Sequence, residues 1–293
     1  MSRRVPRESG TLEPGAHGAA TQAPRRGLAG VPPILLGVGG VHAAALAGVL
    51  AAPAAWPWAL GAALGSHALV TALSLTPRTG LLGPNLTRLP PPCAARGEIG
   101  LTIDDGPEPR VTPAVLDLLD AHGAKASFFC IGERVARHPE LAREIVRRGH
   151  RVENHSARHR HDFALLGPRG YRAELAAGQA LIQAATGVAP SYFRAPAGFR
   201  NPWCWPALRD ADLRLASWTR RGFDTRERDP ARVLGRLTRG LAAGDILLLH
   251  DGHGAAGSHD GAVLLRVLPD LLGLLRERSL RAVALPVPPE GHA

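Results

Sequence analysis

Two adjacent carboxylates, Asp104 and Asp105, directly follow the short apolar run at residues 99–103 and precede a Gly-Pro pair. An apolar, β-branched run that stops at turn residues indicates a buried strand. Neighbouring carboxylates repel each other and are costly to desolvate unless positive charge lies close to them. The pair therefore suggests a site that holds a cation or moves a proton. The competing interpretation is a surface turn that only closes a strand.

His155 and His159 stand four residues apart after another candidate strand. On one turn of helix this spacing places both imidazoles on one face, where they could hold a single metal ion. Asp105 is the nearest carboxylate that could complete such a set. The nearby His161 leaves open which histidines would bind the metal. An isolated His-x-x-x-His pair more often has no metal-binding role than it forms a ligand pair.

Arg194 and His250 also come at the ends of predicted strands. An arginine at this position could bind a buried carboxylate and lower its pKa, although a plain surface arginine is the alternative. The turn at residues 196–198 exposes backbone N–H groups. His250 ends an apolar run at residues 246–249 and would reach the same edge of a sheet, unless it merely caps the strand. The joint placement of these residues indicates an active site more strongly than any one of them.

Strands alternate with helices over residues 98–286, which predicts an α/β domain with a parallel sheet covered by helices. The candidate strands are residues 99–103, 126–131, 151–154, 191–194, 213–218, 245–250 and 281–285. Helices are expected from Thr112, as N-cap residue, to Gly123, and at about 139–149, 168–187, after Asp229 and at 262–277. Seven strands in a segment of this length suit a compact, incomplete (β/α) barrel.

Over about residues 96–286 the chain resembles the polysaccharide deacetylases with the NodB homology domain, carbohydrate esterase family 4. Residues 102–107 (TIDDGP) match the first family motif, residues 155–159 the second, residues 194–198 the third and residues 248–250 the fifth. The resemblance implies a NodB-like fold, a distorted (β/α) barrel without a complete eighth unit, in agreement with the strand count.

The resemblance also implies roles for the matching residues. Asp104 would be the catalytic base, Arg194 would hold its carboxylate, and His250 would be the general acid. The ligands of a divalent metal, with Zn²⁺ as the expected ion, would be Asp105, His155 and His159. This assignment leaves His161 out of the metal set.

The fourth family motif is only partly present. Trp218 and Asp224 keep the family spacing, so Asp224 would orient the catalytic histidine. Thr225 stands where the family usually has a tryptophan, and Ala197 stands where it usually has a tyrosine. The backbone N–H of Ala197 would still stabilise an oxyanion, whereas both changes remove aromatic walls from the substrate groove.

The implied activity is metal-assisted hydrolysis of an N-acetyl or other N-acyl group on an amino sugar, in a poly-, oligo- or lipid-linked saccharide. A carbohydrate O-acetyl esterase or a deformylase could use the same site. An inert, membrane-tethered glycan-binding protein is a third possibility from a different class. The full set of matching acids and histidines argues against an inert site.

The composition does not point to a nucleic-acid partner. The formal net charge is +10, Lys125 is the only lysine, and the arginines are scattered without interleaved aromatic residues. The three cysteines, Cys93, Cys130 and Cys204, show no Cys-x-x-Cys spacing and do not form an even disulfide framework.

Residues 27–77 contain no Asp, Glu, Lys or Arg. Within them, residues 31–50 and 54–75 are each long enough to span a bilayer. Arginines flank both outer ends and the short connection is uncharged, so the positive-inside rule predicts a multi-pass helical hairpin in the cell membrane with both ends cytoplasmic. The alternative is a single signal or anchor segment, with the second segment buried elsewhere.

The remaining segments complete the domain organisation. Residues 1–30 are expected to be a disordered basic tail, residues 31–76 the hairpin, residues 77–97 a linker, and residues 287–293 a short tail after the catalytic domain. A catalytic domain held close to a bilayer on its cytoplasmic side is well placed for a lipid-linked saccharide. The sequence leaves the sugar and the oligomeric state open.

Overall fold

The computed structural model describes residues 31–252 and 262–287 of the chain. The basic tail expected at residues 1–30 and nearly all of the tail expected at residues 287–293 lie outside the described residues.

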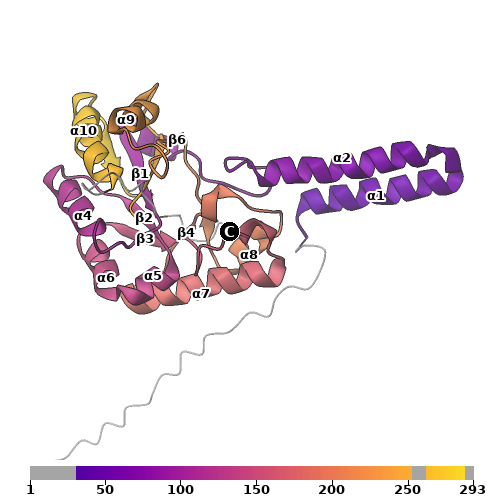
Figure 1. Ribbon diagram of the computed structural model, residues 1–293, viewed down its shortest axis with the longest axis horizontal. Coiled ribbons are helices and arrows are strands. Elements are labelled where there is room, and N and C mark those ends of the chain that lie inside the picture. Colours follow the sequence, from indigo (N-terminus) through magenta and orange to yellow (C-terminus); the bar gives the residue numbers. More distant parts are fainter. Residues whose placement is uncertain (1–30, 253–261, 288–293) are drawn as a thin grey trace, which may run out of the picture. The chain divides into compact units, whose positions relative to one another are not determined.

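An eight-stranded parallel sheet forms the centre of the described part of the catalytic domain (Figure 1). The strands are β1 (Glu98–Asp104), β2 (Ser127–Cys130), β3 (Arg151–Asn154), β4 (Tyr192–Phe193), β5 (Arg214–Leu215), β6 (Arg220–Arg221), β7 (Ile246–His250) and β8 (Arg281–Val283). Their order is β5-β4-β3-β2-β1-β7-β6, with β8 paired to β1. In the described residues the two end strands of this order do not pair with each other, so the fold is the incomplete (β/α) barrel that the sequence predicts.

Seven of the strands correspond to the predicted ones, and β6 was not predicted. Two arginines have no apolar pattern that could predict a strand. They form β6 because Arg220 and Arg221 pair in parallel with Leu247 and Leu248 of β7. The predicted strands at residues 191–194 and 213–218 shorten to two residues each in the structure. Pairing with a neighbour, and not local composition, therefore sets the strand ends on this side of the sheet.

Alternation along β1 and β7 determines which side chains enter the barrel. Ile99, Leu101 and Ile103 lie in the hydrophobic core between the sheet and its covering helices. Ile246 and Leu248 of β7 belong to a separate cluster on the other face of the sheet. Since successive side chains of a strand point to opposite faces, Asp104 and His250 fall on this second, inner face. The strand pattern thus places both polar residues inside the barrel mouth.

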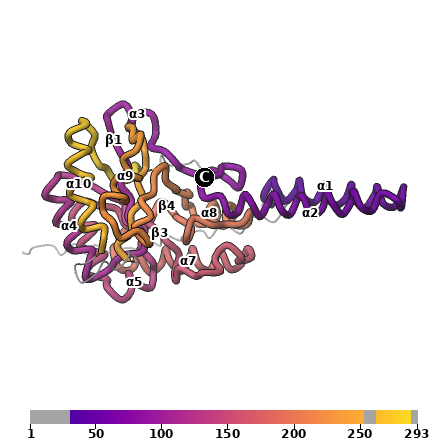
Figure 2. Tube along the Cα trace, turned by 45° about the horizontal axis from the view of Figure 1, so that its top comes forward, coloured from indigo at the N-terminus to yellow at the C-terminus, as the bar shows by residue number. Residues whose placement is uncertain are grey.

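The described helices of the catalytic domain surround the sheet (Figure 2). They are α3 (Pro91–Ala95), α4 (Thr112–Ala121), α5 (Gly132–Arg137), α6 (Pro139–Arg147), α7 (Pro168–Thr186), α8 (Cys204–Asp210), α9 (Pro230–Thr238) and α10 (Val263–Glu277). Short 3₁₀ turns are η3 (Phe163–Leu165) and η4 (Pro196–Gly198).

The prediction that Thr112 is the N-cap of the first of these helices was wrong. Helix α4 begins at Thr112 itself, after Val111 in the cap position. The Thr112 hydroxyl accepts a hydrogen bond from the Glu108 N–H at 2.8 Å and donates one to Asp251 Oδ2 at 2.5 Å. The Thr112 hydroxyl is therefore used in hydrogen bonds with Glu108 and Asp251, although local sequence rules predict that it caps the helix. Asp229, by contrast, caps α9 through the Ala231 N–H at 2.9 Å, in line with the expected helix start.

The segment predicted as a linker, residues 77–97, packs against the sheet. The Leu86 N–H donates to the Leu215 carbonyl at 2.9 Å, next to the end of β5, and the Leu89 N–H donates to the Gly244 carbonyl at 2.8 Å, just before β7. Leu82 and Leu89 are only 3% and 5% exposed. This segment thus contacts the chain near β5 and near β7, on opposite sides of the open barrel.

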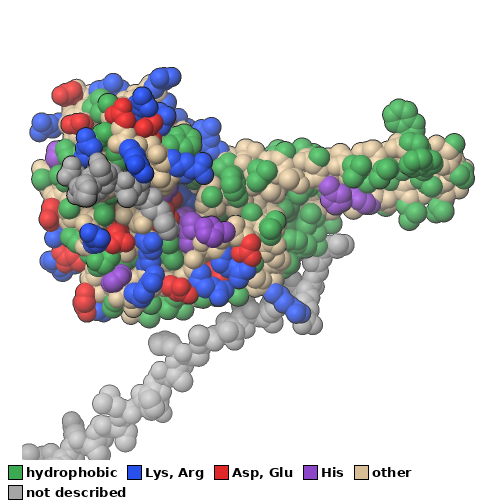
Figure 3. Space-filling model, in the orientation of Figure 1, with side chains coloured by type: hydrophobic (Ala, Val, Ile, Leu, Met, Phe, Trp, Pro, Cys, Tyr) green, Lys and Arg blue, Asp and Glu red, His purple; other side chains and the backbone are tan. Residues whose placement is uncertain are grey.

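Two helices, α1 (Pro33–Ala51) and α2 (Trp56–Ser74), precede this segment and are joined by the short η2 turn (Pro53–Ala55). They pack on each other, with the rings of His42 and His67 5.1 Å apart. Neither helix contains a buried residue. Hydrophobic side chains cover much of the helix pair, while acidic and basic side chains gather on the rest of the molecule (Figure 3).

Only α1, among the helices of the described residues, is long and apolar enough by itself to cross a membrane, with a mean hydropathy of 2.0. Because α1 lies near the N-terminus, an anchor and a signal sequence would both have these properties. The prediction of two membrane-spanning segments is therefore supported for the first segment alone.

Candidate active site

The sequence-predicted site residues come together at the carboxyl ends of neighbouring strands. The register pairs Asp104 of β1 with His250 of β7. It also pairs Asn154 of β3 with Phe193 of β4, so that His155 and Arg194 follow on adjacent strands. Sites of parallel α/β folds form at this edge because the loops that follow the strands converge there. Asp104, Asp105, His155, His159, Ala197 and His250 line one pocket of about 620 Å³, whereas Arg194 and Asp224 are not part of its lining.

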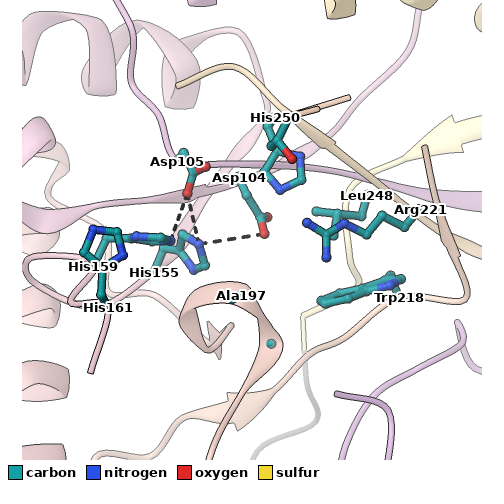
Figure 4. Close-up of a pocket in the computed structure, with 12 residues that line it drawn as sticks. Asp104, Asp105, His155, His159, His161, Ala197, Trp218, Arg221, Leu248 and His250 are labelled. Atoms are coloured by element: carbon teal, nitrogen blue, oxygen red, sulfur yellow. Dashed lines mark ion pairs between the residues drawn. The ribbon is translucent and has the colours of Figure 1, made fainter. Parts of the chain in front are cut away.

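Asp105, His155 and His159 form a cluster that could hold a metal ion. Their potential ligand atoms all lie within 4.8 Å of one another. Asp105 Oδ1 is 3.2 Å from His155 Nε2 and 3.3 Å from His159 Nε2, as the dashed lines in Figure 4 show. His161, which left the choice open, also lines the pocket but is not part of this cluster.

The donor set has the chemistry of a site for a divalent cation. His155 Nδ1 lies 2.8 Å from the Arg194 carbonyl, which can only accept, so Nδ1 carries a hydrogen and Nε2 is the ring nitrogen that faces Asp105 and would bind a metal ion. Burial opposes a charged His155, but Asp104 and Asp105 outweigh it and raise the pKa of His155. Two imidazole nitrogens and one carboxylate oxygen beside this excess of negative charge fit a metal such as zinc.

The histidine pair is not on a helix, in contrast to the reasoning from its spacing. Residues 155–159 form a loop in which Ser156 and His159 have positive φ angles of 65° and 51°. Asn154 Oδ1 accepts from the Ser156 N–H at 2.8 Å, and Ser156 Oγ accepts from the His159 N–H at 2.9 Å. These two side chains hold the loop in the shape that turns both imidazoles toward Asp105.

The two adjacent carboxylates point to different partners because β1 ends between them. Asp105 has a φ of 78°, outside the extended region, so simple strand alternation is not what separates the two side chains. Its N–H still donates to the Phe129 carbonyl at 3.0 Å. The chain therefore turns sharply at Asp105 while Asp104 keeps its place in the strand.

Asp104 is held by a buried arginine. Arg194 Nη1 donates to Asp104 Oδ1 at 2.6 Å and to the Thr102 hydroxyl at 2.8 Å. Its other donors reach the Ala216 and Ser217 carbonyls at 3.1 and 2.9 Å. Burial lowers the pKa of Arg194, partly offset by the charge of Asp104. The guanidinium is thus fixed from several sides and presents one edge to the carboxylate.

His250, which lines the pocket, forms a second buried pair with Asp224. His250 Nδ1 lies 2.9 Å from Asp224 Oδ1, and the His250 N–H donates to Asp224 Oδ2 at 2.7 Å. Because Nδ1 of His250 donates to the Asp224 carboxylate, Nε2 is the ring nitrogen that remains available for proton transfer. Burial works against a protonated His250, but the hydrogen bond and charge of Asp224, with the charges of Asp104 and Asp105, raise its pKa.

Ala197 and Thr225 line the pocket at the two positions where the sequence departs from the family motifs. Ala197 sits in η4 with a φ of 54° and is itself exposed. Trp218, Leu248 and Arg221 form the side of the pocket opposite the histidine pair (Figure 4). Trp218 is therefore an aromatic wall that remains in the groove.

Sequence reasoning missed Arg221 as a pocket residue and interpreted it, with Arg220, as a short basic pair on a solvated surface. The available signal was its position between Trp218 and Asp224, inside the fourth motif. Its guanidinium carbon lies 5.6 Å from the centre of the Trp218 ring, close enough for a cation–π contact.

Comparison with known proteins identifies the family. The sequence model described as polysaccharide deacetylase matches residues 92–216. A peptidoglycan-N-acetylglucosamine deacetylase of Bacillus cereus is 33% identical over 59% of this chain and 81% of its own length. A chitooligosaccharide deacetylase of Bradyrhizobium sp. is 34% identical over 64% of this chain and 88% of its own length.

A similar solved structure is that of a Bacillus anthracis pseudoenzyme of carbohydrate esterase family 4, in a mutant form with restored activity. It has a TM-score of 0.61 and 25% identity, and the match covers 69% of this chain and 70% of that one. The fold, the strand-end site and the two relatives lead to one assignment. This chain belongs to the polysaccharide deacetylase family of hydrolases, carbohydrate esterase family 4.

Proposed function

We propose that this protein removes the N-acetyl group from an amino sugar of a saccharide, with Asp104 as base and His250 as acid. The observation that supports this most directly is that one pocket contains a carboxylate held by Arg194 and an imidazole held by Asp224. A general base must be unprotonated and a general acid must be protonated, so the two groups need different electrostatic environments. The relatives named as deacetylases of peptidoglycan and chitooligosaccharide support the substrate class.

In this mechanism the protein supplies positioned charge and proton transfer. A divalent cation on Asp105, His155 and His159 would polarise the acyl carbonyl and acidify the attacking water. Asp104 accepts the proton of that water, and Arg194 orients this carboxylate through the hydrogen bond from its Nη1. The backbone N–H of Ala197 stabilises the negative charge that develops on the acyl oxygen. His250 donates a proton to the leaving amine, and Asp224 stabilises the imidazolium before the transfer.

The test is acetate release from N-acetylglucosamine oligomers by the metal-depleted protein and by the protein supplied with Zn²⁺. Acetate release that depends on added metal is the expected result. Hydrolysis of O-acetylated sugars alone, or of N-formyl sugars alone, would assign the same pocket to an esterase or a deformylase. Saccharide binding without any release would identify an inert glycan-binding protein.

We further propose that α1 and α2 form a membrane hairpin that holds the catalytic domain at the cytoplasmic face. The two helices expose large apolar side chains; Trp58 is 83% exposed and Leu50 75%. Such surface is costly in water and is covered without cost by lipid. Arg78 and Arg88 after α2, with arginines before α1, support the orientation by the positive-inside rule.

A hairpin of this kind favours a lipid-linked saccharide as substrate. Deleting residues 1–76 should leave acetate release from short soluble oligomers intact and reduce release from lipid-linked sugars in vesicles. A reporter fused after Ala293 tests the orientation, because a fusion active only outside the cell membrane would contradict the cytoplasmic placement.

A further inference from the structure

A second cleft, of about 810 Å³, adjoins the active-site pocket and shares Trp218 and Arg221 with it. Among the described residues that line it there are four arginines and no carboxylate. These arginines are Arg78, Arg220, Arg221 and Arg236. Cationic side chains concentrated in a cleft attract anions and raise their local concentration.

Two of these arginines have acidic partners outside the cleft lining. Arg220 Nε lies 2.9 Å from Asp245 Oδ2, and Arg236 Nη2 lies 3.2 Å from Glu227 Oε2. Each of these carboxylates also pairs with a further arginine beyond the cleft. Asp245 is shared by Arg88 and Arg220, which leaves a net positive charge beside the cleft. Arg232 also pairs with Asp229, so Glu227 and Asp229 together balance Arg232 and Arg236.

The other two arginines form no ion pair within residues 31–252 and 262–287. Arg78 is exposed and donates one hydrogen bond, from Nη1 to the Thr219 carbonyl at 3.2 Å. Arg221 lies 5.1 Å from the Phe223 ring centre, and its Nε is shielded from solvent with no hydrogen-bond partner in the described residues. Both guanidinium groups keep donors in the fork geometry that binds phosphate oxygens.

The shared wall allows one molecule to occupy the pocket and the cleft together. Figure 4 shows Arg221 across the pocket from His155 and His159. In a 2-acetamido sugar, the anomeric carbon is bonded to the carbon that carries the acetamido group. A charged group on the anomeric carbon would therefore lie next to the amide that reacts at the metal cluster.

We propose that Arg78 and Arg221 bind a phosphate or diphosphate group on the anomeric carbon of the substrate sugar, an assignment that rests on the proposed deacetylase function. Arg78 closely follows the end of α2 at Ser74. The cleft thus lies where the chain leaves the apolar helix pair. A saccharide joined to a membrane lipid through phosphate would present its anionic group at this position.

The experiment compares acetate release from N-acetylglucosamine 1-phosphate and from methyl N-acetylglucosaminide, using the full chain with Zn²⁺ in a neutral detergent. We expect kcat/KM to be about 10- to 100-fold higher for the phosphorylated sugar, as for hydrogen bonds to a charged group. Arg78→Gln and Arg221→Gln should each lower this ratio about tenfold, and Arg78→Lys should restore part of it.

Arg276→Gln is the matched control, because Arg276 is exposed in the last turn of α10, at the end that leads into β8 and away from the strand carboxyl ends. It should keep the wild-type ratio. A wild-type ratio near one, with the neutral sugar deacetylated, would overturn the anion site and leave the proposed function standing.

If neither sugar releases acetate, acetate release from N-acetylglucosamine oligomers decides the proposed function separately, and calorimetric titration with inorganic pyrophosphate decides the anion site. Weaker binding by Arg78→Gln supports the site, whereas equal binding overturns it. An unchanged ratio combined with weaker sedimentation of Arg78→Gln on phosphatidylglycerol vesicles would assign these arginines to lipid headgroups and would also overturn the proposal.

Discussion

Asp104 and Asp105 are neighbours in the chain with separate electrostatic environments. Asp104 Oδ1 is bonded to Arg194 at 2.6 Å, and Asp105 Oδ1 faces the two imidazole Nε2 atoms. Asp104 thus pairs with a guanidinium, whereas Asp105 faces two imidazole rings, so the two neighbouring carboxylates have different partners. Under the proposed mechanism, this division would let Asp105 serve as a metal ligand and Asp104 as the base.

Asp104→Asn should reduce kcat/KM by about 10²–10⁴-fold, the range typical of a lost general base. Metal binding should persist, because the substitution leaves Asp105, His155 and His159 unchanged. Acetate release and the zinc content of the purified protein are the two measurements. Asp105→Asn is the matched control and should lose metal; substantial activity in Asp104→Asn would contradict the assignment of the base.

Asp224→Asn should move the alkaline limb of the kcat/KM profile to lower pH. His250 must be protonated to act as an acid, and Asp224 contributes to a pKa raised above the usual value. Without the carboxylate, the pKa of His250 falls and the protonated form is lost earlier as the pH rises. The pH profile of acetate release measures this shift, with zinc content as the control. An alkaline limb at the same pH in both proteins would rule out this role.

At the level of secondary-structure elements, the loop after β3 depends on the close approach of α7. The Asn154 amide donates to the Leu175 carbonyl of α7 at 3.1 Å while its Oδ1 holds the Ser156 N–H. Gly178 makes this approach feasible, since a Cβ there would lie 2.6 Å from Asn154 Oδ1. The helix thus fixes the loop that carries both candidate histidine ligands.

Gly178→Ala should therefore destabilise the fold by about 1–3 kcal/mol, as overpacking does, and weaken zinc binding. Gly235→Ala is the matched control, because an added Cβ on this exposed position of α9 meets no atom within 4 Å. That control should gain about 0.5–1 kcal/mol from better helix propensity. Urea unfolding and zinc titration measure both effects; equal stability and metal affinity of Gly178→Ala and wild type would contradict the packing argument.

Considered as a whole, the molecule ties the end of its N-terminal helix pair to the catalytic domain through a buried arginine. The Arg200 N–H donates to the Ser74 carbonyl at 3.2 Å, and its guanidinium donates to the Pro77 and Thr79 carbonyls at 3.0 and 2.6 Å. The leucines that follow then pack into the open side of the sheet. The segment at residues 77–97 is therefore part of the folded domain as well as its connection to α2.

Truncation at two points tests this conclusion. Deleting residues 1–76 keeps the Pro77 contacts and should leave the Tm of the catalytic domain close to that of the full chain. Deleting residues 1–90 removes the buried Leu82 and Leu89, which contribute about 1.5–3 kcal/mol each, and should lower the Tm markedly. Thermal unfolding followed by circular dichroism is the measurement. Equal Tm values for both truncations would show that the segment is only a tether.

The sequence alone determined the strand–helix alternation, the incomplete barrel and the family, because these depend on local periodicity and on motifs with fixed spacing. Asp104, Asp105, His155, Arg194 and His250 could be found in this way since each follows a recognisable apolar strand. Strand β6 and Arg221 could not, because two arginines acquire strand geometry only by pairing with β7.

Only the tertiary structure decided how the candidate ligands converge. The left-handed turns at Asp105 and His159 have no reliable signal in composition. The Asp105 N–H donates to the Phe129 carbonyl of β2, and the His159 N–H donates to Ser156 in the loop that follows Asn154, whose side chain contacts α7. The same holds for residues 77–97, whose Pro- and Gly-rich sequence is typical of a linker but whose few leucines find a hydrophobic surface on the sheet. Contacts between segments far apart in the sequence, which no local pattern encodes, contribute to the conformation of these segments.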